Sequence, residues 1–337
     1  MSRLPQDMKR AFRLALTAWV AAIASTSVWA QGHAPALGLQ HVFTFSAYGK
    51  GPLSAPDGVA VDPVRNEVYV ADPATHEVVI LNAKGSPAFR FQHWVRDPRG
   101  AGPLVQGEPC CALPGDKGTI FVTDRMSDQI DVTDFRGRKL RSLDLTALLG
   151  SAQKAAPRRM DRDPAGNLYV VEEMSRQVIV ISPQGKVLRK LGGRGKQASQ
   201  FEMIADVAVD AAGMTYVLDS EREPGVKVFD GNGAYVRGFG EHSDRPEGLH
   251  FPVAVATDHT GVVWIVDSFA HEVKAFTAAG DCLADFGHMG SGDGQFYFPS
   301  DVACSAGDEL YVVERGGDRL QGFQIQRAPS TGAGAMP

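Results

Sequence analysis

The chain carries YVAD at positions 69–72, and the same pattern of an aromatic residue, two further residues and an acid returns five times. The copies are FVTD (121–124), YVVE (169–172), YVLD (216–219), WIVD (264–267) and YVVE (311–314). Their acidic ends are 52, 48, 47, 48 and 47 residues apart. A nearly constant repeat of this length is typical of a β-propeller, in which each unit is one four-stranded blade. The sequence therefore predicts an all-β protein, a six-bladed β-propeller.

Each unit contains the same parts in the same order. A lead-in, the segment just before the first strand, opens each unit. It contains a proline in five units, and the fourth unit has Ile204 instead. The prolines are Pro56, Pro109, Pro157, Pro252 and Pro299. A short apolar strand, the YVAD-type strand, a β-branched strand and an outer strand follow. Their apolar runs are typical of sheets covered on both faces, as stacked blades are.

The two ends of the chain complete one blade in this interpretation. The sixth unit stops after its third strand, and an unassigned strand, HVFTFSAYG (41–49), precedes the first unit. Joining them leaves no large sheet edge exposed. We therefore expect the N-terminal strand to close the last blade.

The acids that end the YVAD-type strands have a structural explanation. A carboxylate at the end of a strand can accept backbone N–H groups of the following turn. We expect this role for all six acids, and we expect the aromatic residues that open these strands to pack between blades.

The arrangement resembles the NHL repeat. The resemblance rests on the pattern Pro-x-x-V-A-V-D, then YVAD, then x-H/R-V, with GSGDGQFYFP (290–299) between blades, and it covers about 41–325. It implies the propeller fold but leaves the activity open. The family includes secreted bacterial binders, RNA- or protein-binding modules of animal cells and a peptide-amidating lyase.

The lyase chemistry does not carry over to this chain. In that branch three histidines, each directly after the lead-in proline in alternate blades, hold zinc, which needs converging imidazoles. Here the corresponding positions contain no histidine, and they are occupied by Asp57, Cys110, Arg158, Ala205, Val253 and Ser300. The resemblance therefore assigns no catalytic residue, no metal ligand and no cofactor.

The N-terminus has the pattern of a secretory signal peptide. Basic residues (Arg3, Lys9, Arg10, Arg13) precede an apolar run over 14–28, which is too short to span a membrane, and Val28-Trp29-Ala30 resembles a cleavage site. We expect a signal peptide at 1–30, a propeller at 31–325 and a disordered tail at 326–337. The protein is then periplasmic or extracellular, has no transmembrane segment and is expected to be a monomer.

The charge is unevenly distributed. Loss of residues 1–30, with four basic and one acidic side chains, lowers the formal net charge from −5 to −8. Residues 136–196 nevertheless hold 14 Lys or Arg against 5 Asp or Glu. This basic sector is either a solvated edge or a contact surface for an anionic partner. Outside the cytoplasm, such a partner is a glycan, a lipid headgroup or an acidic protein rather than nucleic acid.

Four cysteines are expected in an oxidising compartment: Cys110, Cys111, Cys282 and Cys304. Cys282 lies on an outer strand and Cys304 on an inner strand, about 14 Å apart, so they are too far apart to bridge. Cys110 and Cys111 form either a strained vicinal disulfide or two buried thiols, and the sequence does not decide between them.

The lead-ins predict a ligand site. They line one mouth of the channel, and their aligned positions converge on carboxylates, guanidinium groups and sulfur, which favours a polar or charged ligand. The candidate ligand-binding residues are Asp57, Cys110, Cys111, Arg158, Arg159, Asp206, Ser300 and Asp301. Aspartate at the positions of Asp206 and Asp301 is also ordinary turn chemistry in NHL repeats.

Two other features have structural explanations. His76 and His271, in ATHEV and FAHEV, occupy the histidine position of the repeat consensus. The glycine-rich GHMGSGDGQF (287–296) neither follows a buried strand nor opens a helix, so it is a connection between blades rather than a phosphate loop.

Three functions are compatible with these observations. The first is an interaction module that binds a partner at the channel mouth. The second is a hydrolase or lyase that uses the mouth carboxylates, with a divalent metal at Asp57, Asp206 or Asp301. The third is a scaffold of an envelope protein complex, which would use a blade edge.

Overall fold

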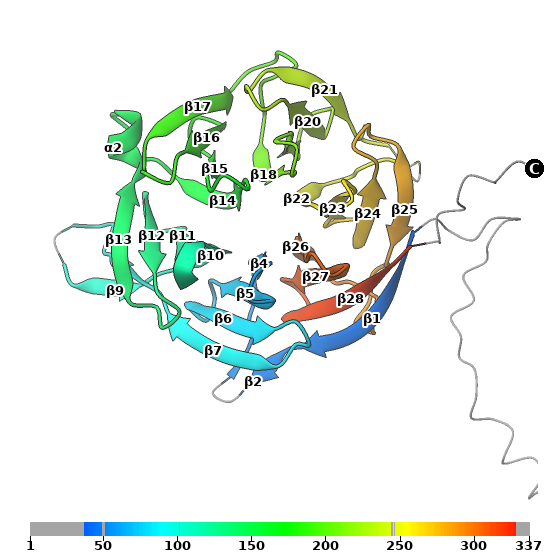
Figure 1. The fold of residues 1–337 in the computed structure, drawn as a ribbon, viewed down its shortest axis with the longest axis horizontal. Helices are drawn as coiled ribbons and strands as arrows, with labels where there is room; N and C mark the ends of the chain where they lie inside the picture. The colour runs from blue at the N-terminus through cyan, green and yellow to red at the C-terminus, as the bar shows by residue number, and fades with distance from the viewer. Residues whose placement is uncertain (1–36, 49–50, 101, 244, 246, 328–337) are drawn as a thin grey trace, which may run out of the picture. The chain divides into compact units, whose positions relative to one another are not determined.

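The computed structural model describes residues 37–48, 51–100, 102–243, 245 and 247–327. These residues form six four-stranded antiparallel sheets arranged around a central channel (Figure 1). The six-bladed propeller predicted from the repeat is therefore confirmed. The expected signal peptide at 1–30 and the last residues of the chain, 328–337, lie outside the described residues.

The blades run from the channel outwards in chain order. Blades one to three contain β4 (Gly58–Asp62), β5 (Glu67–Asp72), β6 (Glu77–Asn82) and β7 (Pro87–Gln92); β10 (Pro109–Pro114), β11 (Ile120–Asp124), β12 (Gln129–Thr133) and β13 (Lys139–Asp144); β14 (Pro157–Arg162), β15 (Leu168–Glu172), β16 (Gln177–Ile181) and β17 (Val187–Gly192). Blades four to six contain β18 (Ile204–Val209), β19 (Thr215–Asp219), β20 (Val226–Phe229) and β21 (Tyr235–Phe239); β22 (Pro252–Thr257), β23 (Val263–Asp267), β24 (Glu272–Phe276) and β25 (Cys282–Phe286); β26 (Pro299–Cys304), β27 (Glu309–Glu314), β28 (Arg319–Arg327) and β1 (Leu37–Phe45).

The sixth blade is closed by the N-terminal strand, as expected. Strand β1 pairs antiparallel with β28, from Leu37 opposite Arg327 to Phe45 opposite Leu320. The boundaries differ from the prediction, because β1 covers 37–45 rather than 41–49 and β28 continues two residues past 325. The expected disordered tail at 326–337 therefore overlaps β28 by two residues, because Gln326 and Arg327 pair with Gly38 and Leu37 of β1.

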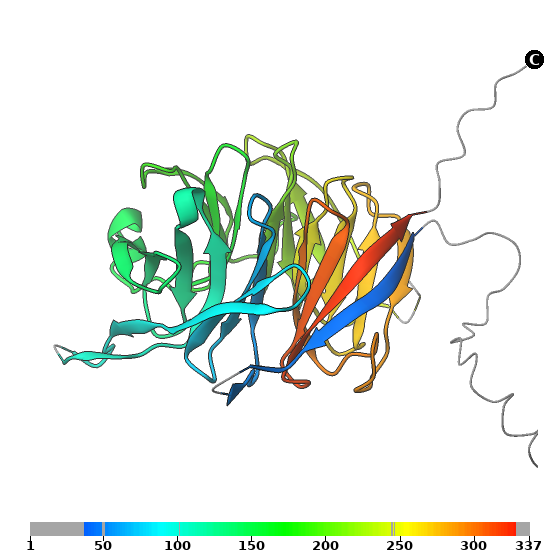
Figure 2. The ribbon, with the colours of Figure 1, turned by 60° about the horizontal axis from the view of Figure 1, so that its bottom comes forward.

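Several short elements were not predicted, among them a 3-10 turn at Asp116–Gly118. A hairpin of β8 (Trp94–Arg96) and β9 (Leu104–Gln106) interrupts the connection between blades one and two and accounts for the longer first step of the repeat; Figure 2 shows it projecting from the ring. A small pair, β2 (Ala47–Tyr48) and β3 (Gly51–Pro52), precedes blade one. Helix α2 (Leu145–Leu149) follows blade two and is capped by Asp144, which accepts the N–H of Ala147 at 2.8 Å.

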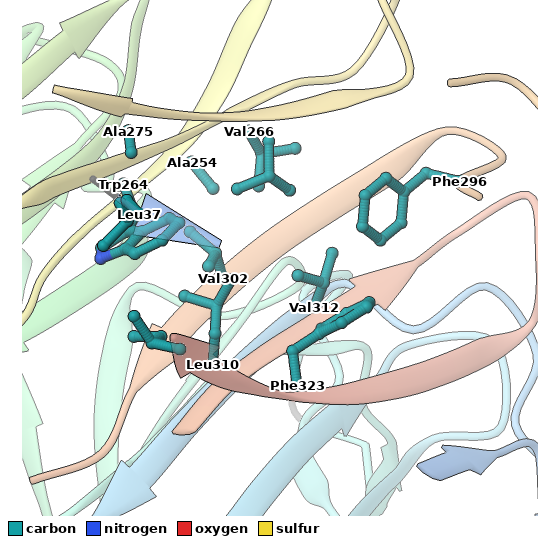
Figure 3. Close-up of a cluster of buried hydrophobic side chains, with 12 residues drawn as sticks. Leu37, Ala254, Trp264, Val266, Ala275, Phe296, Val302, Leu310, Val312 and Phe323 are labelled. Carbon is teal, nitrogen blue, oxygen red and sulfur yellow. The ribbon is translucent and has the colours of Figure 1, made fainter. Parts of the chain in front are cut away.

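Hydrophobic cores lie between neighbouring blades rather than around one centre. Between blades five and six, Trp264 and Val266 pack against Val302, Val312 and other buried side chains, including Leu37 from β1 (Figure 3). Each such apolar side chain stabilises the fold by about 1.5–3 kcal/mol through its burial. The prediction that the blades are covered on both faces is confirmed by these clusters.

Five of the six acids at the ends of the YVAD-type strands accept N–H groups of the following turn, as predicted. Glu314 instead accepts the N–H of Tyr297 from the preceding connection and the side chains of Arg319 and Gln321. All six acids are no more than 2% exposed. Asp72 accepts the N–H of Ser54 at 2.6 Å from the preceding connection and that of Thr75 at 3.1 Å from the following turn. Glu172 does the same for Ala156 and Ser175, both at 2.8 Å. These carboxylates therefore tie each connection to its own blade.

Candidate functional site

The connections between blades lead into the inner strands at one end of the channel, which we call the proximal mouth. Arg159, at the start of blade three, crosses this mouth. Its guanidinium donates to Asp301 Oδ2 at 2.8 Å, and to the carbonyl oxygens of Asp57 at 2.8 Å, Ser300 at 3.1 Å and Cys110 at 3.4 Å. One side chain thus contacts blades one, two and six, because it is long enough to reach past the channel axis. The bonded N–H groups of Arg159 therefore face protein rather than solvent.

Asp206 and Asp301 form ties between neighbouring blades. Asp301 Oδ2 accepts the N–H of Val59 at 2.8 Å, and Asp206 Oδ2 accepts that of Val255 at 2.8 Å. Burial raises the pKa of Asp301 to about 6 against the lowering effect of Arg159, and burial together with the charge of Asp301 raises that of Asp206. Their oxygens already accept protein donors. The described residues contain no group of three or more His, Cys, Asp or Glu arranged to hold a metal ion.

The vicinal cysteines are buried behind this network. All four cysteines are free thiols, so Cys110 and Cys111 are two buried thiols rather than a vicinal disulfide. Cys110 Sγ lies 3.4 Å from Thr123 Oγ1, and Cys111 Sγ faces the carbonyl oxygen of Met160 at 3.9 Å. Burial raises the pKa of both thiols, so neither has the thiolate character of a reactive cysteine.

Two of the predicted residues lie at the edges of the network. Ser300 Oγ donates to the carbonyl of Pro56 at 2.9 Å and so joins blades six and one. Arg158 Nε donates to Glu173 Oε2 at 2.8 Å and is partly exposed. The predicted convergence is therefore observed for Asp57, Arg159, Ser300 and Asp301, mostly as contacts between blades. Ligand binding by the eight candidates stays a prediction.

Asp57 is held by two arginines that the sequence analysis missed. Arg125 donates to Asp57 Oδ2 at 2.6 Å, and Arg315 donates to the other oxygen, Oδ1. Burial alone would raise the pKa of Asp57, but the guanidinium groups of Arg159, Arg315 and Arg125 lower it to about 2. The side chains of Arg125 and Arg315 are 32% and 52% exposed. We call Arg125, Asp57 and Arg315 the arginine clamp.

A sequence signal for the clamp exists but lies outside the lead-in alignment. Arg125 and Arg315 each directly follow the acid that ends a YVAD-type strand, and this position also faces the proximal mouth. Across the six units it holds Pro73, Arg125, Glu173, Ser220, Ser268 and Arg315. Aligning this position as well would have shown two arginines.

Beside the clamp, five rings form a second feature of the proximal side. Phe269 stacks on Phe251 with centroids 4.5 Å apart, and its edge meets Phe298 at 6.3 Å. His271 lies 4.7 Å from Phe298 and is parallel to Tyr297 at 5.8 Å. We call this group the aromatic platform; its members are Phe251, Phe269, His271, Tyr297 and Phe298. They come from two connections between blades and one turn of blade five.

The two consensus histidines are structural, as predicted. His76 Nδ1 lies 2.6 Å from the carbonyl oxygen of Gly107, in the lead-in of blade two. His271 Nδ1 accepts the N–H of Phe298 at 3.1 Å, in the lead-in of blade six. Both residues have a positive φ, 63° and 59°, in the turn of their blade. Each histidine therefore joins its blade to the next one.

The glycine-rich connection behaves as expected. Residues 287–296 join β25 to β26, and Met289 pairs with Phe296, whose ring is buried in the core between blades five and six. Gly294 donates its N–H to Gln321 Oε1 at 2.9 Å. The glycines thus fold the connection onto the blade.

Much of the basic sector is neutralised locally. Arg159 pairs with Asp301 at the channel. Arg162 pairs with Asp116 at 2.5 Å, and Arg176 pairs with Glu202 at 3.1 Å. Arg141 and Lys190 are exposed on the outer strands β13 and β17. Both alternatives for this sector, a solvated edge and a contact surface, therefore stay open.

A cavity of about 540 Å³ occupies the channel beyond the network, on the side away from the proximal mouth. Arg159, Asp206 and Asp301 lie at its inner end, and the turns after the inner strands line its opening, with Asp116 and His259 among them. Asp161 also lines it, and burial raises the pKa of this carboxyl to about 6. The sequence analysis predicted a site at the opposite mouth, although four of its eight candidates, Cys111, Arg159, Asp206 and Asp301, also line this cavity.

Comparisons with known proteins define the class of fold. No protein-family model matches the chain. The brain tumor protein of Drosophila melanogaster is 30% identical over 151 residues, which cover 44% of this chain and only 14% of that protein. The similarity is thus confined to about a seventh of the length of that relative.

Solved structures resemble the whole propeller. An inactive virginiamycin B lyase from Staphylococcus aureus with quinupristin has a TM-score of 0.57 at 14% identity, covering 88% of this chain and 89% of that one. A luciferin-regenerating enzyme has a TM-score of 0.62 at 12% identity, covering 85% and 95%. The WD40 propeller of Doa1 has 0.52 at 13%, covering 82% and 80%. At these identities the likeness establishes the propeller fold alone.

The fold and the site together define a six-bladed β-propeller module whose proximal mouth carries an arginine clamp and an aromatic platform. Across the described residues, no helix is long and apolar enough to cross a membrane.

Proposed function

We propose that this protein is a secreted or periplasmic NHL-type propeller that acts as an interaction module and binds an anionic group of its partner at the proximal mouth. The quoted repeat motifs support the NHL assignment, and the local similarity to the brain tumor protein agrees with it. The export part of the proposal is supported by the pattern of residues 1–30.

The arginine clamp is the observation that carries the binding function. Two guanidinium groups use one nitrogen each on opposite oxygens of a single carboxylate, Asp57. A guanidinium has five N–H donors in a planar fork, so both arginines keep donors that face solvent. A carboxylate or phosphate that approaches from solvent meets two cations that are already positioned, which lowers the entropic cost of binding it.

The clamp is rigid on the protein side. Asp57 is buried, keeps its charge down to a pH of about 2 and is itself tied to blade three through Arg159. The arginines come from blades two and six, so the anion site lies across blade one. Such a site depends on the closed ring, because its two cations are far apart in the sequence.

The test uses three anionic probes and the mature chain. The probes are an acidic peptide, a heparin-derived oligosaccharide and phosphatidylglycerol vesicles, and the variant is Arg125→Gln/Arg315→Gln. We expect at least one probe to bind at low ionic strength and the double variant to raise its Kd about tenfold or more. Added salt should weaken wild-type binding, because the contact is between charges.

The matched control is Arg138→Gln, which removes an exposed arginine paired with Asp134 in blade two. Its Kd should stay within about twofold of the wild type. The proposal fails if none of the three probes binds, or if the double variant binds as well as the wild type while circular dichroism shows that both are folded.

Export and oligomeric state are tested on the full-length chain. Expression with its own N-terminus in a Gram-negative host, fractionation and intact mass should give a periplasmic or extracellular monomer cleaved after Ala30. An uncleaved chain in the cytoplasmic fraction would contradict the export proposal and leave the binding test unaffected.

A further inference from the structure

The aromatic platform is unusual because three of its five rings are exposed together. Phe269, Tyr297 and Phe298 are 62%, 38% and 37% exposed, whereas five of the six aromatic residues that open the YVAD-type strands, Trp264 among them, are buried. Neighbouring exposed rings on a soluble protein are typical of an interaction site, because water is excluded from them when a partner binds.

The backbone holds Phe298 in a conformation that large side chains rarely adopt. Its φ is +49°, in the left-handed region, which is an outlier for a bulky residue. The N–H of Phe298 donates to His271 Nδ1 at 3.1 Å, and its carbonyl accepts the N–H of Arg315 at 3.0 Å. These two bonds hold the backbone of Phe298 in this conformation, and such constrained positions concentrate at functional sites.

Glycine at position 316 leaves the rings uncovered. A Cβ atom there would lie 2.7 Å from Tyr297 Cδ1 and 3.1 Å from Phe298 Cδ2. Any side chain at this position would therefore displace the two rings or cover them. Gly316 also directly follows Arg315, so the chain between the clamp and the platform carries no side chain of its own.

The platform borders the arginine clamp directly. The N–H of Arg315 donates a hydrogen bond to the carbonyl oxygen of Phe298. The two residues therefore lie on neighbouring segments whose backbones are about 5 Å apart, as in paired strands. On an extended polypeptide, side chains on one face repeat every 7 Å or so, and adjacent ones are closer along the chain. An apolar and an anionic side chain one or two positions apart therefore match the spacing of the two features.

We propose that the proximal face binds an extended polypeptide segment in which an aromatic or large aliphatic side chain lies one or two positions from a carboxylate. The apolar side chain packs on Phe269 and Phe298, and the carboxylate meets Arg315. This inference rests on the proposed function and names the class of its partner. Charge complementarity with the clamp selects an acidic segment, and the platform selects one with a large apolar side chain.

The experiment uses three synthetic peptides with one labelled end. The first is an acidic peptide with tryptophan next to glutamate, the second replaces tryptophan by alanine, and the third replaces the glutamates by glutamine. The protein variants are Phe269→Ser and Phe298→Asn; asparagine tolerates the left-handed conformation, so this variant retains the backbone. The control is Phe135→Ser, an exposed ring of blade two that is 48% accessible.

We expect the tryptophan peptide to bind the wild type about tenfold more tightly than either matched peptide. Phe269→Ser and Phe298→Asn should abolish the advantage of the tryptophan peptide over the alanine peptide, and Phe135→Ser should preserve it. The salt dependence of the alanine peptide should be unchanged in the platform variants, because its binding involves the clamp alone.

The failures of the two proposals differ. If the tryptophan and alanine peptides bind equally well and depend on Arg125 and Arg315, the polypeptide inference fails while the anion-binding function stands. If the vesicles or the oligosaccharide bind through the clamp and no acidic peptide does, the inference fails in the same way. If no binding responds to Arg125→Gln/Arg315→Gln, the proposed function itself fails.

Discussion

Arg159 of blade three donates to Asp301 Oδ2 of blade six at 2.8 Å, so a single ion pair joins opposite sides of the ring. The same guanidinium reaches the carbonyl oxygens of Asp57 and Ser300. Because the pair is almost fully buried, the charge of Asp301 depends on this one guanidinium for compensation. The contact lies at the inner end of the cavity, and the bond from Arg159 to the carbonyl oxygen of Asp57 helps to position Asp57 for the two arginines of the clamp.

Replacing Arg159 by methionine should destabilise the protein by about 3–5 kcal/mol, because it leaves Asp301 and its neighbour Asp206 buried with no guanidinium between them. Urea unfolding followed by circular dichroism measures the change. Adding Asp301→Asn should recover part of the loss, since one uncompensated carboxylate is then removed.

Arg158→Met provides the control for that measurement. Its guanidinium pairs with Glu173, and both side chains are partly exposed, so the cost should be about 1 kcal/mol or less. Equal losses for the two variants would show that Arg159 does not have the special role described.

The stability should depend on pH through His93. Its Nδ1 lies 2.8 Å from Asp124 Oδ2 and its Nε2 3.1 Å from Asp131 Oδ2, so both nitrogens face carboxylates, and Lys139 also contacts Asp131 at 2.6 Å. Burial lowers the pKa of His93, but the bonds to the two carboxylates outweigh it and raise the pKa above 6.5. A raised pKa means that the charged form stabilises the fold below a pH of about 6.5, and this contribution is lost as the pH rises through the higher pKa of the folded state.

Urea unfolding of the wild type and of His93→Gln between about pH 5.5 and 9 checks this behaviour. The stability difference between them should be largest at the acidic end and should shrink towards the alkaline end. His259→Gln, at an exposed histidine, is the control. A difference that stays constant or grows with pH would contradict the charged state of His93.

Ring closure by β1 predicts the effect of a truncation. Removing residues 31–45 leaves the last blade without its outer strand and exposes the whole edge of β28. We expect a lower melting temperature and aggregation on size-exclusion chromatography. Removal of residues 31–36 should have little effect, and a monomeric 31–45 truncation with the wild-type melting temperature would be incompatible with closure by β1.

The free thiols predict slow alkylation in the native state. Cys110, Cys111 and Cys304 are held by burial at a raised pKa, so the thiolate that reacts is scarce. Iodoacetamide should modify these three slowly in the folded protein and all four cysteines in urea. An intact mass lower by one pair of hydrogens, with fewer than four modified thiols in urea, would instead indicate a disulfide.

The sequence predicted the fold because the information is local and repeated. The spacing of the six acids gives the number of blades, and the missing outer strand of the last unit, set against the unassigned strand at 41–49, predicts how the ring closes. The roles of Asp72, Glu172, His76 and His271 follow from the same alignment, because each bonds to a connection next to its own blade.

The site was predicted only in part. The lead-in alignment brought Asp57, Arg159, Ser300 and Asp301 to one mouth, and the structure has them in contact. The alignment does not say whether a side chain that reaches the mouth faces a ligand or another blade. Both terminal nitrogens of Arg159 bond to protein acceptors, whereas Arg125 and Arg315 lie at a different position of the repeat and were missed.

By itself, the sequence determined the class of fold, the number of blades and the way the ring closes, because strand periodicity and repeat spacing are properties of neighbouring residues. Only the tertiary structure decided which charges pair and which rings remain exposed. Arg315 meets Asp57 from 258 positions away, and the platform joins residues from separate connections. Such contacts depend on the distances and directions of side chains across the closed ring, which no local pattern encodes.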